Sequence, residues 1–231
     1  MSARRSLHEL LVPNDSAWPI VQAWIQGAAN TVEVLPPHPD SRGRALEEVQ
    51  VTTRSPMGAI VYETGGIFID HGWLRILGSG HHRIRRSLPE WNRGRSVSAD
   101  GRSHGFLLVA DDVVGGFYAL NGGAFGPETG KIFYFAPDTL RWESMNNMDY
   151  SGFLVWALGD KLSRFYTSLR WDGWESEVSF MGGDSALSVH PFLWSKEGQD
   201  IARSSRKACP IEEVYEQNVV DPAAQLRTGR L

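Results

Sequence analysis

The sequence is poor in cysteine, and this scarcity excludes several kinds of site. Cys209 is the single cysteine among 231 residues, so the chain can form neither an internal disulfide nor a multi-cysteine zinc or iron–sulfur site. A lone thiol is typical of proteins from reducing compartments, and we therefore expect a cytoplasmic location. Because Pro210 follows it, we interpret Cys209 as a small apolar residue near a turn.

Long apolar runs and a strong net charge are also missing. Near the start, His8, Glu9 and Pro13 interrupt the chain before any apolar run of signal-peptide length, and no later stretch approaches the ~20 apolar residues of a spanning helix. The formal net charge is −4, which provides no global attraction to nucleic acid or to an anionic membrane. We therefore expect neither a membrane association nor a nucleic-acid partner.

Signatures of common catalytic and cofactor sites are missing as well. The run GGFYALNGG at 115–123 lacks the Lys-Ser/Thr of a phosphate-binding loop and leads to another strand-like run, so the dinucleotide fingerprint fails too. A metal hypothesis would need the histidines near Asp70, but adjacent loop histidines rarely bind one ion and no HExxH spacing is present; these histidines are His71, His81, His82 and His104. We expect no cofactor, no metal site and no catalytic residue.

One enzymatic alternative stays open. Ser79 lies between two glycines, although the nucleophile elbow of hydrolases requires Gly-x-Ser-x-Gly between a strand and a helix. Serine, histidine and aspartate can still assemble from distant positions. The alternative is therefore a small serine-type hydrolase with a glycine-lined cleft, using Ser79, His71 or His81, and an aspartate such as Asp70.

Short apolar runs separated by turn residues indicate strands. The runs at 67–69 and 73–77 flank Asp-His-Gly and predict a hairpin. Three further runs, separated by Asp-Asp and Asn-Gly-Gly, predict an antiparallel meander; they lie at 106–110, 116–120 and 131–135.

Apolar residues recur at helical spacing in two places. This spacing predicts a helix over 18–28 and helical structure from 150 to 169, while the proline-rich run at 35–40 predicts a connector. The sequence contains no internal repeat and no long linker. We therefore expect a single α+β domain, a mostly antiparallel sheet with packed helices; it spans 1–231, with a core at about 16–196 and a polar C-terminal tail at about 197–231.

Two segments are candidates for contact with a partner. Residues 78–103 form the one basic segment. Arginine forks can bind phosphate, but the whole chain is acidic and no aromatic residue beyond Trp91 lies between the arginines, so we interpret the segment as a solvated or protein-facing loop. A turn after the second helix carries two tryptophans, the residue type that dominates binding hot spots. The predicted binding residues are Arg83, Arg85, Arg86, Trp171 and Trp174.

Several phrases of the sequence resemble a known family. They are TRSPMG at 53–58, TGGI at 64–67, HGWLRILGSG at 71–80, FAPDTL at 135–140 and LRW at 169–171. Together they resemble the bacterial domain-of-unknown-function family 2625 over roughly residues 18–194. No catalytic residues come with this resemblance.

A weaker resemblance is to the SUKH superfamily. It rests on a first helix, the Gly-Gly at 65–66, strands at 116–120 and 131–135, and a closing helix that begins YSGFL at 150. This resemblance implies an α+β fold and a function like that of immunity proteins, which bind and neutralise bacterial toxins. We therefore expect a non-enzymatic binding protein with a protein partner, while the partner's identity and the oligomeric state stay open.

Overall fold

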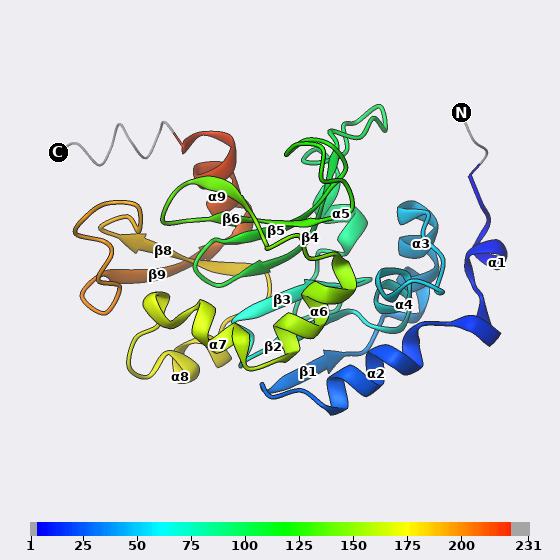
Figure 1. The fold of residues 1–231 in the computed structure, drawn as a ribbon, viewed down its shortest axis with the longest axis horizontal. Coiled ribbons are helices and arrows are strands. Elements are labelled where there is room, and N and C mark those ends of the chain that lie inside the picture. Colours follow the sequence, from blue (N-terminus) through cyan, green and yellow to red (C-terminus); the bar gives the residue numbers. More distant parts are fainter. Residues whose placement is uncertain (1–3, 223–231) are drawn as a thin grey trace.

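Seven strands form one antiparallel sheet in which neighbours along the chain are also neighbours in space (Figure 1). The computed structural model describes residues 4–222. The strands are β1 (Val32–Leu35), β2 (Gly66–Ile69), β3 (Leu74–Leu77), β4 (Phe106–Asp112), β5 (Phe117–Asn121), β6 (Ile132–Ala136) and β7 (Arg141–Ser144). The α+β fold and the meander predicted at 106–135 are confirmed, since β4, β5 and β6 pair antiparallel in that order.

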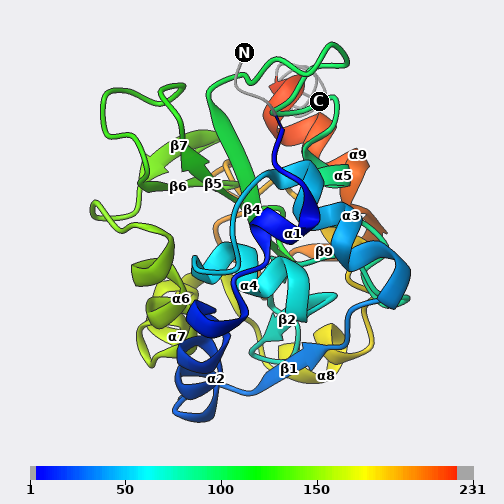
Figure 2. The same ribbon diagram turned by 90° about the vertical axis from the view of Figure 1, so that its right-hand side faces the viewer.

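Helices pack on both faces of this sheet. The longer helices are α2 (Trp18–Gln26), α3 (Pro39–Val49), α4 (Pro56–Glu63) and α6 (Tyr150–Leu158). The shorter ones are α1 (Leu7–Leu10), α5 (Leu88–Asn92), α7 (Lys161–Phe165), α8 (Trp174–Ser179) and α9 (Ile211–Tyr215). Figure 2 shows α1 to α4 gathered beside the sheet, with α6 and α7 on the same side of the molecule as α2.

Alternation along β5 decides which helices cover which face. Successive side chains of a strand point to opposite faces. The ring of Phe117 contacts Trp91 of α5 and Tyr215 of α9, whereas the ring of Tyr118 contacts Phe153 of α6. Helices α5 and α9 therefore cover one face, and α6 covers the other.

Local signals explain where the predicted helices begin. Helix α2 carries a proline in its first turn, where the missing amide costs nothing. Helix α6 begins after Asp149, whose carboxylate accepts a hydrogen bond from the Gly152 N–H at 2.8 Å. Both predicted helices are confirmed, and α6 packs on the sheet as the spacing of its aromatic residues indicates.

The proline-rich run at 35–40 is not a plain connector. It ends β1 at Leu35 and begins α3 at Pro39. The His38 side chain accepts a hydrogen bond from the Asp40 N–H at 3.3 Å and caps the helix. The expected connector is thus confined to residues 36–38, because proline, which breaks a helix interior, is well suited to the first position of a helix.

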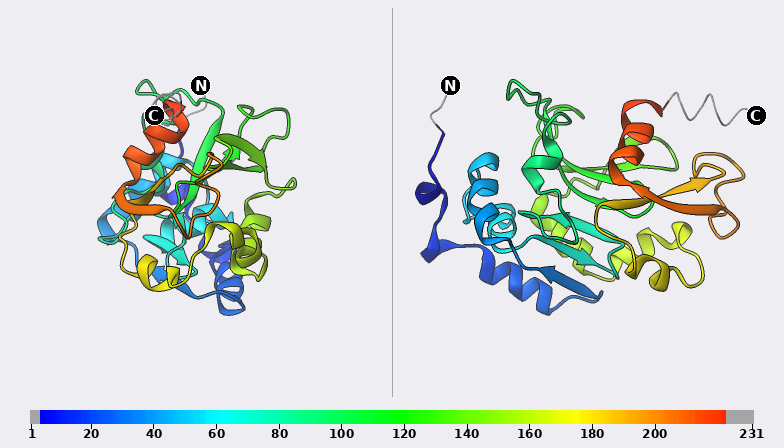
Figure 3. Two further views of the ribbon diagram at one scale, coloured as in Figure 1. Left: turned by 90° about the vertical axis from the view of Figure 1, so that its left-hand side faces the viewer. Right: turned by 180° about the vertical axis from the view of Figure 1, so that it is seen from behind.

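A second hairpin projects from the main sheet at the end opposite α1 (Figure 3). Strands β8 (Ser185–His190) and β9 (Ser205–Pro210) pair antiparallel, and α9 follows at once. The side chains of Ile211, Val214 and Tyr215 are buried. The polar tail expected at about 197–231 therefore contains strand β9 and the packed helix α9. Its residues 223–231 lie outside the described part of the chain.

Candidate binding site

The predicted arginines have three different environments. Arg85 is on the surface, with its side chain 83% exposed and its Nε 3.3 Å from Asp184. Arg83 is partly exposed, pairs with Glu33, and lies 5.1 Å from the Phe68 ring centroid. Arg86 is buried, with 6% of its side chain exposed. The basic segment is thus not a uniformly solvated loop, and a role of these arginines in binding stays a prediction.

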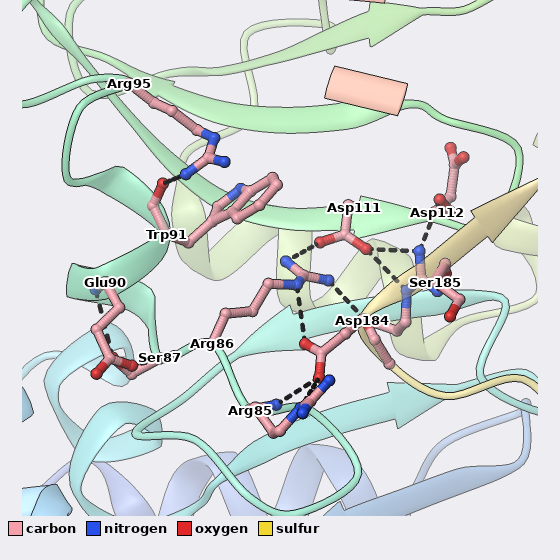
Figure 4. A network of polar contacts seen from close by, with 12 residues as sticks. Arg85, Arg86, Ser87, Glu90, Trp91, Arg95, Asp111, Asp112, Asp184 and Ser185 are labelled. Atoms are coloured by element: carbon pink, nitrogen blue, oxygen red, sulfur yellow. Dashed lines mark hydrogen bonds and ion pairs between the residues drawn. The ribbon is translucent and has the colours of Figure 1, made fainter. Parts of the chain in front are cut away.

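Burial of Arg86 results from a charge network that only the fold assembles (Figure 4). The register of β3 and β4 places Arg75 directly opposite Asp111, and the Arg75 Nε donates to Asp111 Oδ1 at 2.7 Å. Arg86 reaches Asp111 Oδ2 at 2.6 Å from the other side and donates to the Gly183 carbonyl at 2.7 Å. The network therefore joins the main sheet to the segment that leads into β8.

The predicted tryptophans also lie below the surface. Trp171 and Trp174 are 6% and 9% exposed, and both rings contact Trp73 in the core. The Arg170 guanidinium lies 4.1 Å from the Trp174 ring centroid, and that of Arg206 lies 4.2 Å from Trp171. Each ring thus already has a cation from this chain on it. A role in binding stays a prediction for both, and their surroundings are those of core residues.

Ser79 and its proposed partners do not assemble. The Ser79 side chain is buried, and its hydroxyl donates to the Thr64 carbonyl at 2.9 Å. Asp70 pairs with Arg170, and His71 stacks edge-on against Trp174 at 5.9 Å. The geometry thus supplies no serine–histidine dyad at Ser79 within residues 4–222.

The histidines are likewise dispersed. His81 and His82 stack on each other at 3.9 Å between ring centroids, while the His104 Nδ1 lies 2.8 Å from the Arg95 carbonyl oxygen. Among residues 4–222, no three His, Cys, Asp or Glu side chains converge in an arrangement that could hold a metal ion. Over the same residues, no helix combines the length and the hydropathy needed to cross a bilayer.

A hollow of about 580 Å³ lies where α6 and α7 diverge from the sheet beside β7. Its volume falls in the range of typical small-ligand and side-chain pockets. The walls are mainly apolar and come from both layers; they include Tyr134 of β6, Met145 and Met148 after β7, Trp156 of α6 and Phe165 of α7. Figure 2 shows β7 at the margin of the sheet, above α6 and α7.

The aromatic wall of this pocket is held by edge-to-face contacts. The Phe165 ring meets Tyr134 at 5.2 Å and Trp156 at 5.3 Å between centroids, at interplanar angles of 75° and 87°. Such T-shaped pairs are the favoured aromatic geometry. Ring contacts therefore hold the aromatic side of the pocket, while the two methionines of its lining supply adaptable surface.

The apolar wall of the hollow is partly exposed to solvent. Helix α6 reads YSGFLVWAL and has no charged residue, although a helix that is apolar on all sides is normally enclosed. Here Val155 is 51% exposed and Phe165 is 38% exposed at the pocket rim. Polar groups at the rim include Glu143, Asp160 and Lys161. An apolar surface with a polar border is typical of interaction sites.

A buried carboxylate fixes Tyr134 behind the pocket. Asp112 Oδ2 accepts hydrogen bonds from the Tyr134 and Tyr166 hydroxyls, each at 2.8 Å. Its Oδ1 accepts from the backbone N–H groups of Val114 and Gly116 at 3.0 and 2.8 Å. Since the Asp112 carboxylate is fully enclosed and its oxygens accept these four bonds, we assign it a positioning role.

Burial sets the protonation of this cluster. Burial raises the pKa of the Asp112 carboxyl above its ordinary value, against the hydrogen bonds from Gly116, Tyr134 and Tyr166, which lower it. Burial also raises the pKa of each of these two tyrosines, and of Tyr118, well above the usual value. The tyrosines therefore stay neutral, and because Tyr166 donates to Asp112, the Tyr118 hydroxyl, 2.6 Å away, donates to Tyr166.

Sequence reasoning did not identify this pocket. The apolar spacing at 150–169 predicted helical structure packed on the sheet and did not indicate a pocket. The available signal was the absence of any charge in 150–158, which predicts a helix without a solvent face. Pairing of β7, which has only four residues, decided where the pocket opens.

Comparisons with known proteins place the chain in a family. Residues 7–214 match the family described as "Protein of unknown function DUF2625", and the chain belongs to this family. A relative from Escherichia coli (strain K12), described as "Putative uncharacterized protein YbfG", is 45% identical over 92% of this chain and 94% of its own length. An "Uncharacterized protein" of Haemophilus influenzae (strain ATCC 51907 / DSM 11121 / KW20 / Rd) is 40% identical over 94% and 95%.

Proposed function

We propose that this protein is a non-enzymatic recognition module that binds an apolar segment of another protein in the pocket between β6, β7, α6 and α7. One observation carries the proposal: the uncharged helix α6 presents Val155, 51% exposed, beside a hollow of about 580 Å³ with aromatic walls. Exposed apolar surface of this kind is stabilised when a partner removes it from water.

The surroundings of the pocket support a protein partner over a small ligand alone. Val155 and Phe165 line the hollow and are 51% and 38% exposed, so its apolar wall is more open to solvent than that of a typical small-ligand site. A protein segment inserts one apolar side chain and covers both rim residues at once, as anchor residues of interfaces do. The rim groups Glu143 and Lys161 would then border the contact with water-accessible charges.

Photo-crosslinking in the producing bacterium tests this proposal. p-Benzoylphenylalanine in place of Phe165 should give a discrete adduct with one protein, whereas the same group in place of Phe180 should not. Phe180 is a matched control, because it is an apolar residue on a different helix end and is 89% exposed. Identical adducts at both positions would mean unspecific contact, and a folded protein without an adduct at position 165 would refute the proposal.

Binding of the identified partner by purified protein gives the quantitative test. Val155→Asp should weaken its affinity by at least about tenfold, because the substitution places a charge in the desolvated part of the contact. Phe180→Asp should leave the affinity unchanged. Equal losses in the two variants would contradict a site at the pocket.

A toxin is the class of partner that the resemblance to SUKH proteins implies. If the crosslinked partner is a toxin, co-expression of this protein should restore growth to cells that produce it. The protection should disappear with Val155→Asp and persist with Phe180→Asp. A partner with no effect on growth would leave the recognition site in place and would rule out the immunity function.

A further inference from the structure

We infer that this protein forms a twofold dimer by antiparallel pairing of β7 with β7 of a second copy. Strand β7 ends the order of the seven-stranded sheet, and its residues are largely exposed. An unpaired edge strand is a template for a further strand, and natural proteins usually protect it. What joins this edge is decided by which backbone groups point outward and by the charges along the strand.

The backbone groups of Trp142 and Ser144 point away from β6. Residues of an antiparallel strand alternate between bonding inward and outward. The Met145 N–H donates to the Ile132 carbonyl of β6 at 3.0 Å, so Met145 bonds inward. By alternation Glu143 and Arg141 also bond inward, and the N–H and C=O groups of Trp142 and Ser144 are available to a new strand.

Among the registers that this alternation allows, the one centred on Trp142 brings opposite charges together. Pairing about Glu143 would place Glu143 opposite its own copy, which is repulsive. Pairing about Trp142 makes two symmetric backbone bonds between the Trp142 residues and places Arg141 of each copy opposite Glu143 of the other. These positions are a close, non-hydrogen-bonded pair on one face, where opposite charges attract.

Both charged side chains are accessible for such pairing. Arg141 and Glu143 are exposed. Within residues 4–222 the Arg141 side chain has no ion pair or hydrogen bond. Glu143 accepts one hydrogen bond, from the Thr139 hydroxyl at 2.8 Å, through Oε1, and its second oxygen is available. A strand of mixed charge with this spacing is self-complementary, which is what a twofold contact requires.

The dimer goes beyond the proposed function and adds to it. A twofold axis between paired edge strands is perpendicular to the sheet, so the same face of both copies points the same way. The pocket lies on the face of Tyr134, Glu143 and Met145, and the two pockets would therefore open side by side. A partner with two apolar segments would gain affinity from binding both.

Charge reversal tests the dimer and its register together. The mass of the wild-type protein in solution should rise with concentration from 25.7 kDa toward twice that value. Arg141→Glu and Glu143→Arg should each raise the dissociation constant of the dimer by at least about tenfold, because each turns two attractive pairs into two repulsive ones. An equimolar mixture of the two variants should dimerise again, since every pair in the mixed dimer is attractive.

The control is Arg164→Glu, which reverses an exposed arginine of α7 that pairs with Asp160 rather than with β7. This variant should dimerise like the wild type. Unchanged melting temperatures exclude misfolding as a cause. A wild-type protein that stays at 25.7 kDa at all concentrations overturns the inference, and so does a mixture of the two β7 variants that stays monomeric. Neither result would bear on the proposed binding site in the pocket, which is tested separately with Val155→Asp.

Discussion

Replacing Asp111 by alanine should strongly destabilise the protein, because two buried guanidinium groups would lose their shared counter-ion. Asp111 is inaccessible to solvent, and the side chains of Arg75 and Arg86 are 1% and 6% exposed. Removing one partner of a buried ion pair typically costs about 3–5 kcal/mol. In a chain of this size a change of 1 kcal/mol shifts the melting temperature by about 2–4 °C, so a loss of roughly 6–20 °C is expected.

Urea unfolding followed by tryptophan fluorescence measures this loss. The matched control is Asp15→Ala, which breaks the surface pair of Asp15 and Arg54, with an Oδ2–Nε distance of 2.6 Å and side chains 64% and 65% exposed. A pair so accessible to water and salt should contribute at most about 1 kcal/mol. The comparison therefore separates burial from the mere presence of an ion pair.

Equal losses of stability in Asp111→Ala and Asp15→Ala would refute the reasoning. A further variant tests its cause. Replacing the whole charge cluster, with Arg75→Met, Arg86→Met and Asp111→Leu together, leaves no unpaired buried charge and should recover part of the loss. A triple variant less stable than Asp111→Ala would show that the hydrogen bonds of Arg75 to the Ser185 carbonyl and of Arg86 to the Gly183 carbonyl contribute more than the charge balance does.

Two further predictions concern the cluster behind the pocket. Burial raises the pKa of Asp112 in the folded state above its ordinary value of 3.8. Between the ordinary and the raised pKa, the folded state therefore binds more protons than the unfolded state. The contribution of Asp112 to the free energy of unfolding is present below pH 3.8 and falls as pH rises through the folded-state pKa. Urea titrations from acid to neutral pH should therefore show a smaller decline for Asp112→Asn than for the wild type, and parallel curves would contradict the raised pKa. Gly116→Ala should lower the melting temperature and the affinity for an apolar partner, because a Cβ there would lie 2.2 Å from Asp112 Oδ2 and 2.3 Å from the Tyr134 hydroxyl oxygen. Gly182→Ala, whose Cβ would meet nothing within 4 Å, should change neither quantity, and a tolerated Gly116→Ala would mean that Tyr134 is not held as described.

The elements that could be predicted from sequence carry their own local signals. The meander β4–β5–β6 has apolar runs between residues that tolerate tight turns, and its neighbours in space are neighbours in sequence. Helices α2 and α6 combine apolar periodicity with a start signal. Strands β1 and β7 were missed because four residues with mixed polarity have no readable period, and their pairing with β2 and β6 stabilises them.

Side chains were harder to place than elements. Arginine is usually solvated, and the sequence between 78 and 103 gives no indication that Arg86 differs from Arg85. The difference comes from Asp111 on β4: Arg85 and Arg86 both reach Asp184, but of these two only Arg86 also pairs with the buried Asp111. The same reasoning applies to Trp171 and Trp174, whose rings were expected at a surface turn and instead contact Trp73.

By itself the sequence determined the α+β class and the central strands and helices, because these follow from local periodicity, turn residues and caps. It also limited the chemistry, since one cysteine and the missing catalytic spacings are properties of composition and order. Only the tertiary structure decided which aromatic residues of α6 and α7 enclose a pocket, which arginine is buried and which strand is left at the edge of the sheet. Those outcomes depend on contacts between residues tens of positions apart, for which a single sequence contains no local signal.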